Sequence, residues 1–546
     1  MYGNKISSCL ETRNFLPKGW AECSEAQPTV LAFLLCLLYY NNTKAPLGKA
    51  PMPAYLLAID QGTTSSRAII FNQKAELIGE HQIASKNSHP HSGWVEQDPE
   101  EIWKNTVTCC SEVLKLTHLK AKDITAAGIS NQRETSIIWN KETGKAIYPA
   151  IIWQDRRMSM HFTALSQHKI AADIQNKTGL LLDPYFSANK ILWILENIPN
   201  ARQQAESGKL AFGTIDTFLL WRFTKGRVHA TDATNASRTL LFNIRTQQWD
   251  KEILEAFKIP ESILPEVKDC AADFGEVDKK FFGNEIPISA MIGDQQAATV
   301  GQACFEPGMI KATYGTGCFI VLNTGKQIVQ SHNQLISTIA YRLNGKPTYG
   351  LEGSIFSAGI TIKWLRDSLK LITSGAESEI MALHTTDNGG VYFVPAFTGL
   401  GAPYWDADAR GALLGLTSSS TMEHIVRAGL EAVCYQTRDL LECMRLDGVK
   451  QLESLRVDGG MAVNNWLLQF LSDILGISVQ RPYCVENTAL GTAFLAGLQC
   501  GIFQSLTEIS ELWHADATFT PVLQNGQRDN LYQNWKKAVA RVVTHN

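Results

Sequence analysis

Two short segments of this chain share one plan, and this repeat constrains the fold more than any other feature of the sequence. Residues 58–70 read AIDQGTTSSRAII, and residues 312–322 read ATYGTGCFIVL. Each is an apolar run, a turn of glycine and hydroxyl residues, and a second apolar run, which is the pattern of a β-hairpin. The two segments lie about 250 residues apart, roughly one domain length. The repeat predicts two related domains that each offer a hydroxyl-rich hairpin to a shared cleft, although two unrelated hairpins would give the same pattern.

The composition fits a globular chain and narrows the choice of partners. Of the 546 residues, 45% are hydrophobic and 19% are charged, which is material for two sizeable cores. The formal net charge of −3 argues against broad affinity for nucleic acid or for acidic membrane surfaces. The twelve cysteines include no CxxC pair, so we expect reduced thiols rather than a zinc site or a redox motif.

Residues 1–54 form an N-terminal extension without a coherent targeting pattern. Its apolar run, residues 30–40, would rise roughly 17 Å as a helix, which is too short for the ~30 Å bilayer core. Acidic and basic residues balance in the stretch before it, unlike in a signal peptide. We predict no membrane span and expect the extension to be disordered or to reflect a start assigned too early, with Met52 as the natural start. N-terminal sequencing of protein made from its native gene tests this hypothesis.

From residue 55 onward, strands and helices alternate, which predicts α/β layers. Strands are expected at residues 55–60, 67–71, 124–130, 311–314, 318–322 and 455–458, and a hairpin-like turn with Gly144 is expected within residues 135–153. A helix should begin after Asp98 as its N-cap, with Pro99 in the first position and Glu101 completing a capping box. A second helix should end at Gly476.

The first of the two turns carries groups that suit a phosphate. Its glycine allows successive backbone N–H groups to point at an anion, and Thr63, Thr64 and Ser65 add hydroxyl donors. Arg67 adds a fixed positive charge, and Asp60 could hold a divalent ion through water. The turn is not a Walker A loop, because the required lysine is missing. An ordinary polar hairpin explains these residues equally well when they are taken alone.

Seven motifs occur in an order that resembles the FGGY family of carbohydrate kinases. They are IDQGTTSSRA, NQRET, DPYFS, GDQQAA, TYGTGCF, PAFTGLGAPYWD and RVDGG. Residues 185–197 and 411–431 resemble the two longer family signatures, with Gly429 where a larger or hydroxyl residue is usual. The resemblance implies a two-domain actin-like ATPase (ribonuclease H-like) α/β fold, with duplicated mixed β-sheet domains, helices and a central cleft. The N-terminal FGGY domain would span residues 55–302 and the C-terminal domain residues 303–546.

This resemblance implies an enzyme that phosphorylates glycerol to sn-glycerol 3-phosphate with ATP and Mg²⁺ in the cytoplasm. Asp294 would be the general base, and Asp60 and Asp294 would organise the metal. The implied partners are glycerol and ATP, with no nucleic acid and no allosteric protein partner, and the chain is expected to form a homodimer or homotetramer. A kinase for another polyol or a ketopentose, and an actin-like chaperone or filament protein, are the alternatives.

The resemblance also assigns the binding residues. The substrate would be bound by Arg133, Glu134, Trp153, Tyr185, Asp294, Gln295 and Phe319, with Trp153 and Phe319 as apolar walls. The nucleotide would be bound by Thr63, Thr64, Ser65, Arg67, Thr316, Gly359, Lys363, Gly460 and Asn464. Local chemistry also allows structural interpretations that involve no ligand: a helix cap for Asp294, a solvated ion pair for Arg133 and Glu134, and core packing for the two aromatic walls.

Three segments depart from the family pattern. Lys363 stands where members that act on glycerol often carry glutamine, which leaves recognition of the base at this position open. Residues 279–289 lack the glycine-rich loop and the arginine with which some bacterial members bind fructose 1,6-bisphosphate, so we do not expect that control. Residues 518–535 give no basis for binding a phosphotransferase-system regulator.

Overall fold

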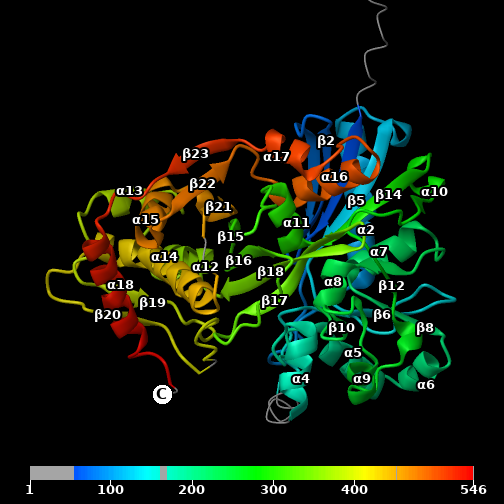
Figure 1. Ribbon diagram of the computed structural model, residues 1–546, viewed down its shortest axis with the longest axis horizontal. Helices are drawn as coiled ribbons and strands as arrows, with labels where there is room; N and C mark the ends of the chain where they lie inside the picture. The colour runs from blue at the N-terminus through cyan, green and yellow to red at the C-terminus, as the bar shows by residue number, and fades with distance from the viewer. Residues whose placement is uncertain (1–53, 160–168, 407, 450–451, 545–546) are drawn as a thin grey trace, which may run out of the picture. The chain divides into compact units, whose positions relative to one another are not determined.

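The computed structural model describes residues 54–159, 169–406, 408–449 and 452–544 (Figure 1). The expectations for residues 1–53, including the start at Met52, lie outside these residues. Helices alternate with strands of two large β-sheets, which confirms the predicted α/β class. Within the described ranges, no helix is both long and apolar enough to cross a membrane. The nine cysteines in these ranges are all free thiols.

The first sheet has six strands in the order β13-β14-β5-β1-β2-β3. These are β13 (Glu276–Val277), β14 (Ile286–Gly293), β5 (Ile124–Asn131), β1 (Tyr55–Gln61), β2 (Ser65–Asn72) and β3 (Leu77–Ala84). Strands β1, β2 and β3 form an antiparallel meander, whereas β5 lies parallel to both β1 and β14. The two strands predicted around the first turn therefore form a true hairpin at the centre of this sheet.

The second sheet has seven strands in the order β17-β18-β16-β15-β21-β22-β23. These are β17 (Ile336–Leu343), β18 (Lys346–Ile355), β16 (Cys318–Gly325), β15 (Ile310–Tyr314), β21 (Ser454–Asp458), β22 (Ser478–Pro482) and β23 (Ala515–Phe519). Strands β15, β16 and β18 are antiparallel neighbours, and β21 lies parallel to both β15 and β22. The central part of each sheet therefore has the same plan, an antiparallel hairpin continued by parallel strands.

The remaining elements cover the sheets or build smaller two-stranded units. The helices are α2 (Pro99–Leu116), α4 (Lys169–Thr178), α5 (Ser187–Asn197), α6 (Ala201–Glu206), α7 (Ile215–Phe223), α8 (Ala233–Ser237), α9 (Lys251–Ala256), α10 (Lys279–Phe282), α11 (Asp294–Gly301), α12 (Gly359–Asp367), α13 (Glu377–Leu383), α14 (Met422–Leu446), α15 (Asn465–Leu475), α16 (Asn487–Gln499), α17 (Leu506–Leu512) and α18 (Asn525–Val539), with 3-10 turns η2 (Ala121–Asp123), η3 (Glu261–Ile263) and η4 (Gly460–Val463). The short strands are β4 (Glu96–Gln97), β6 (Ile137–Asn140), β7 (Ala150–Ile151), β8 (Leu210–Gly213), β9 (Ala230–Asp232), β10 (Phe242–Asn243), β11 (Gln248–Trp249), β12 (Glu266–Lys268), β19 (Tyr392–Val394) and β20 (Ala412–Leu414).

One local prediction needs correction, and a second is confirmed. Asp98 does cap α2, accepting a hydrogen bond from the Glu100 amide at 2.9 Å, but the described hydrogen bonds do not include the reciprocal bond from Glu101. The hairpin-like turn at Gly144 is confirmed, with φ +67°: the Asn140 amide donates to the Lys145 carbonyl at 3.0 Å, and the Ile147 amide donates to the Ile138 carbonyl at 2.9 Å. Strand β6 also pairs with the fully buried strand β8, a pairing that was not predicted.

Helices α11 and α16 pack against one another between the two sheets. Each follows the outer parallel strand of one sheet and reaches the other: α11 follows β14 and contacts β15 and β16, whereas α16 follows β22 and contacts β1 and β5. A Cβ atom on Gly491 would lie 1.9 Å from the carbonyl oxygen of Ala297, and one on Gly301 would lie 2.0 Å from that of Asn487. The helices therefore meet backbone to backbone, which only glycine permits at these two positions.

Candidate active site

The β1–β2 turn presents the first group of predicted residues. The Gly62 amide closes it by donating to the Ser65 carbonyl at 2.9 Å, which leaves Thr64 exposed at the tip. Thr63 Oγ1 accepts a hydrogen bond at 2.8 Å from the indole N–H of Trp153. The predicted phosphate turn thus contacts one of the predicted substrate walls directly.

Arg67 lies at the base of this turn between two carboxylates. Its Nη2 is 2.6 Å from Oδ2 of buried Asp60, and its Nη1 is 2.5 Å from Oε2 of Glu486. Burial opposes the charge on the guanidinium, but the two carboxylates outweigh it and raise the pKa of Arg67. Glu486 immediately precedes α16, 419 residues away in the chain. No local sequence signal connects it to the turn, so its contact with Arg67 could not be predicted from the motifs.

The β15–β16 turn presents the second predicted hydroxyl. Thr316 is exposed, and its carbonyl accepts from the amides of Ala358 and Ile360, each at 3.0 Å. The Gly359 amide donates to the Gly315 carbonyl at 2.9 Å, and a Cβ on Gly359 would lie 2.5 Å from the same oxygen. The structure therefore brings Gly359 and Thr316 together, and it gives Gly359 a steric reason to be glycine.

The strand β21 ends in the predicted glycine pair. Gly459 has φ +88°, and a Cβ there would lie 2.5 Å from the carbonyl of Tyr314, so this glycine is required by backbone geometry. Gly460 is exposed, and a Cβ on it would meet nothing within 4 Å. Asn464 caps α15 by accepting from the Leu467 amide at 2.8 Å. Lys363 is exposed on α12.

The predicted substrate residues converge beyond the end of β5. Arg133 is buried, and its guanidinium lies 5.9 Å from the ring centre of Phe319. The Trp153 ring is 5.7 Å from that of Tyr185 and 6.1 Å from that of Phe319, edge to face in both cases. Glu134 follows with φ +63°, a left-handed backbone that is uncommon outside glycine. These residues come from four separate stretches of the chain and form one aromatic and charged cluster.

Asp294 begins α11 directly after β14. Its Oδ1 is 3.2 Å from Nε of Arg133 and accepts from the Gln295 amide at 2.7 Å. About a quarter of the Asp294 side chain is exposed, 27%, so a ligand can reach it. Burial raises the pKa of this carboxyl, and the nearby cations Arg133 and Lys311 reduce the shift. Gln295 Oε1 accepts from the Lys311 ammonium at 2.6 Å, so its carbonyl already has a partner.

Sequence reasoning missed three buried charged residues behind this cluster. Arg238 forms an ion pair with Glu134, and Glu352 forms one with Arg133. Lys190 donates to the carbonyls of the three successive residues 184–186, at 3.0, 2.7 and 3.1 Å, and so fixes the segment that carries Tyr185. A glutamate within the apolar stretch YGLEGSI was the one sequence signal that pointed to Glu352.

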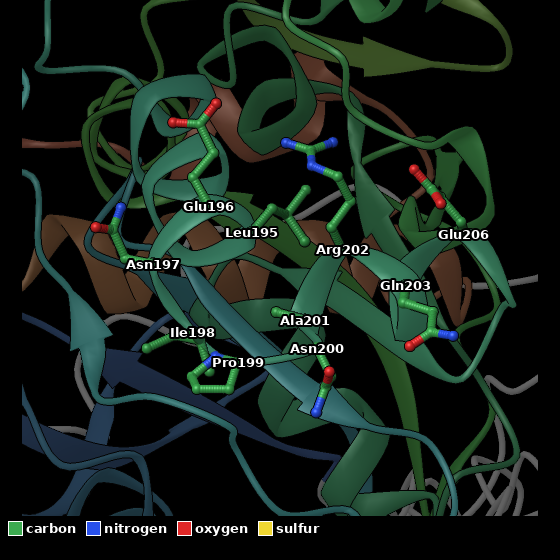
Figure 2. Close-up of a pocket in the computed structure, with 10 residues that line it drawn as sticks. All are labelled: Leu195, Glu196, Asn197, Ile198, Pro199, Asn200, Ala201, Arg202, Gln203 and Glu206. Carbon is green, nitrogen blue, oxygen red and sulfur yellow. The ribbon is translucent and has the colours of Figure 1, made fainter.

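A cavity of about 650 Å³ lies elsewhere on the described part of the chain (Figure 2). It is formed by consecutive residues at the turn between α5 and α6, including Glu196, Arg202 and Glu206. None of the predicted site residues lines it, and several of its side chains are exposed to solvent. The chemistry-bearing groups therefore point to the space beside Asp294 rather than to this surface hollow.

Comparison with protein families identifies two matching domains. The N-terminal domain of the FGGY family of carbohydrate kinases matches residues 55–301, and the C-terminal domain of that family matches residues 310–500. Together they span most of the chain, in the order in which the motifs occur.

Individual relatives agree with this assignment. Glycerol kinase of Coxiella burnetii (strain Dugway 5J108-111) is 59% identical over 494 residues, which are 90% of this chain and 98% of that protein. Glycerol kinase of Marinomonas sp. (strain MWYL1) is 56% identical over 493 residues, covering 90% of this chain and all of that protein.

Solved structures show the same architecture. The crystal structure of Plasmodium falciparum glycerol kinase with ADP has a TM-score of 0.85 and 40% identity, over 90% of this chain and 99% of that one. The ligand-bound xylulose kinase of Lactobacillus acidophilus has a TM-score of 0.80 at 21% identity, over 90% of this chain and 97% of that one, a likeness that bears on the fold alone. The predicted two-domain actin-like fold is confirmed.

Proposed function

The chain belongs to the FGGY family of carbohydrate kinases, and on this basis we propose that it transfers the γ-phosphoryl group of ATP to glycerol, forming sn-glycerol 3-phosphate and ADP. One observation carries the proposal beyond the family. A partly exposed carboxylate, Asp294, lies 3.2 Å from a buried arginine that itself faces an aromatic wall. A base, a hydroxyl-binding cation and an apolar surface in one place are what a small polyol needs for phosphorylation.

Asp294 is the general base of this proposal. The 3-hydroxyl of glycerol gives its proton to the Asp294 carboxylate as its oxygen bonds to the γ-phosphorus, and the bond from that phosphorus to the bridging oxygen of ADP breaks. Burial raises the pKa of the carboxyl, which makes it a better proton acceptor than an exposed aspartate.

Glycerol binds between polar groups and two aromatic rings. Its hydroxyls contact Arg133, Glu134, Tyr185 and Gln295, and Trp153 and Phe319 cover its carbon backbone. The edge-to-face packing of Trp153 on Phe319 supports this arrangement, because it makes an apolar wall that keeps water from the γ-phosphate. Tyr185 stays a neutral hydroxyl donor, since burial raises its pKa above the ordinary value.

The nucleotide occupies the space between the two hairpins. Exposed Thr64 and Thr316 support this proposal, because each hydroxyl is free to donate to a phosphate oxygen. The other phosphate residues are Thr63, Ser65 and Arg67, and those around the base and ribose are Gly359, Lys363, Gly460 and Asn464. The backbone around Gly460 is open, so a ligand can approach it closely.

The described residues fit Mg²⁺ that is held mainly by water and phosphate. They contain no cluster of three or more His, Cys, Asp or Glu side chains that would form an all-protein metal cage. Asp60 and Asp294 are two carboxylates that influence one another electrostatically, the number with which proteins commonly hold Mg²⁺ beside a substrate phosphate. When bound, the ion would neutralise phosphate charge, with Asp60 and Asp294 holding it through its water ligands.

The larger organisation follows the family. We assign the glycerol site and first hairpin to a domain of residues 55–302, and the second hairpin and nucleotide site to residues 303–546. We propose a homodimer or homotetramer that works in the cytoplasm. Light scattering of the purified protein distinguishes these two oligomers from a monomer.

A coupled assay for ADP release, run with and without glycerol, tests the function. We expect ADP formation to depend on glycerol, and kcat/KM to be highest for glycerol when erythritol and xylulose are compared with it. If ADP release is the same with and without glycerol, the result would contradict the proposal and favour a chaperone or filament ATPase. A preference for xylulose or erythritol would assign the chain to another substrate of the same family.

A further inference from the structure

Four ion pairs join five side chains behind the active site into one continuous series. Glu134 Oε1 is 2.6 Å from Nε of Arg238, and Nη2 of Arg238 is 2.9 Å from Oε1 of Glu352. Glu352 Oε2 is 2.5 Å from Nη1 of Arg133, whose Nε is 3.2 Å from Asp294. The side chains of Glu134, Arg238, Glu352 and Arg133 are each at most 2% exposed.

The central carboxylate of this series comes from the second sheet. Glu352 lies on β18, opposite Val321 on β16, the strand that follows the Thr316 turn. Arg133 and Glu134 follow β5, and Asp294 follows β14, both in the first sheet. Arg238 is the C-cap of α8, which contacts β14 of the first sheet and β17 of the second. The half of the molecule that carries the second hairpin thus supplies the anion that holds two arginines of the glycerol site.

Glu352 also keeps two buried cations from repelling one another. Arg133 and Arg238 lie close enough for each to disfavour the charge of the other, and Glu352 is bonded to both. Removal of one partner from a buried ion pair leaves an uncompensated charge, which is strongly unfavourable. Without Glu352 the two guanidiniums would separate, and Arg133 and Arg238 would move away from Asp294 and Glu134.

We propose that Glu352 is a positioning residue for phosphoryl transfer, one that holds Arg133 against Asp294 and Arg238 against Glu134 through a single carboxylate. The inference rests on the proposed function, because Glu134 and Arg133 matter here as glycerol ligands and Asp294 as the base. It goes beyond that function by giving Glu352 and Arg238, which need not touch either substrate, a role in the KM for glycerol and in kcat.

The test compares the full-length wild type with Glu352→Gln, Glu352→Asp and Arg238→Lys. Gln has the shape of Glu but cannot neutralise two guanidiniums, so we expect the KM for glycerol to rise at least 10-fold and kcat to fall at least 10-fold, with the KM for ATP within about 3-fold. Asp keeps the charge and should recover part of the loss. Lys at position 238 keeps a cation but cannot bond Glu134 and Glu352 in a rigid fork, so it should raise mainly the KM for glycerol.

Glu431→Gln is the matched control. Glu431 is equally buried and pairs with Arg427 at 2.8 Å on α14, outside the series. We expect it to lower the Tm without changing the KM for glycerol. Equal kinetic losses in the Glu431 and Glu352 variants, or a folded Glu352→Gln enzyme within about 2-fold of wild type, would overturn the inference.

Two outcomes keep this test separate from that of the proposed function. If wild-type ADP release does not depend on glycerol, the proposed function fails before any variant is measured. If Glu352→Gln does not fold, as its Tm will reveal, Glu352→Asp and Arg238→Lys decide: a raised KM for glycerol in both supports the inference, and unchanged kinetics in both overturn it.

Discussion

Asp294 receives opposing influences from its neighbours, and their balance raises the pKa of its carboxyl, as the proposed role of general base requires. Burial favours its protonated form, whereas the guanidinium of Arg133 and the ammonium of Lys311 favour the carboxylate. A residue that only capped the helix would need none of these charged neighbours, because a serine or asparagine side chain can accept a hydrogen bond from the same backbone amide.

Replacement of Asp294 by Asn should separate binding from chemistry. Asn keeps the volume and one acceptor oxygen but cannot take up a proton, so we expect kcat to fall at least 100-fold while glycerol binding stays measurable by calorimetry. Steady-state kinetics with the same preparation gives the comparison. A kcat near that of the wild type would remove Asp294 from the role of base.

The two arginines around Glu352 make stability depend on pH in a defined direction. Burial alone would raise the pKa of the Glu352 carboxyl, but Arg133 and Arg238 prevail and lower it from 4.5 to about 2. The ion pairs of Glu352 therefore stabilise the fold fully above pH 4.5, and this stabilisation is lost as the pH falls through 2. It amounts to about 3 kcal/mol, at ~1.4 kcal/mol for each pKa unit.

Urea unfolding of the wild type and of Glu352→Gln tests this dependence. At pH 7 the difference between their free energies of unfolding should be largest, and at pH 3 it should have narrowed by about 2 kcal/mol, since more than half of the pKa interval has then been crossed. A difference that stays constant between these pH values would show that Glu352 is not held as a carboxylate by the two arginines.

How well a residue could be predicted depended on whether its signal was local. Asp294, Trp153 and Tyr185 lie in motifs, and the structure places them in one cluster with Phe319. Glu486 and Glu352 could not be found in this way, because their partners lie 419 and 219 residues away and nothing in the chain between them encodes the distance.

At the scale of elements, the contact between α11 and α16 depends on two missing side chains. A helix usually meets its neighbour through interdigitating side chains, at 8–10 Å between axes. Here Gly301 and Gly491 remove them at the crossing, so the backbones touch. The cost is the lower helix propensity of glycine, about 1 kcal/mol at an interior position such as Gly491.

Gly491→Ala should therefore destabilise the protein despite the better helix propensity of alanine. The new Cβ would lie 1.9 Å from a backbone carbonyl, which must move, and overpacking of this kind costs about 1–3 kcal/mol or more. We expect the Tm in a calorimetric scan to fall by several degrees. Gly526→Ala, in α18 with no atom within 4 Å of its Cβ, is the control and should leave the Tm unchanged or higher. A similar Tm for both variants would contradict the steric argument.

Elements that carry their own turn or cap residues were predictable from sequence, whereas contacts between elements far apart in the chain were not. The strands around both turns and the end of α15 at Gly476 were predicted and are confirmed. The pairing of β6 with β8 was missed, because it depends on burial of a strand about 70 residues away. The same holds for α11 and α16, since periodicity gives a helix its apolar face but not the sheet that the face will cover.

At the scale of the whole molecule, the equivalent strand order of the two sheets places the hairpin turns in corresponding positions. Thr64 and Thr316 are exposed at these turns, one from each sheet. If both hold one triphosphate, then neither contact is independent of the other.

A double-mutant cycle tests this dependence. Thr64→Ala and Thr316→Ala should each lower kcat/KM for ATP by about 10-fold, the range for a hydrogen bond to a charged group. The double variant should lose less than the product of the two, because a triphosphate released at one turn is no longer positioned by the other. Thr386→Ala, an exposed threonine outside both hairpins, is the control. Losses that multiply would show that the two turns act separately.

The contact between α11 and α16 at Gly301 and Gly491 also fixes the angle between the two helices, and this angle matters for the reaction. Asp294 begins α11 seven residues before Gly301, a distance of about 10 Å along the helix axis. A rotation of about 5° at the crossing would move Asp294 by about 1 Å, a displacement that can cost an enzyme on the order of 100-fold in rate. Glu486, which holds Arg67, lies at the other side of the same crossing, one residue before α16. If Asp294 and Arg67 act as proposed, the alignment of base and phosphate depends on an angle of a few degrees, fixed where two polypeptide backbones touch.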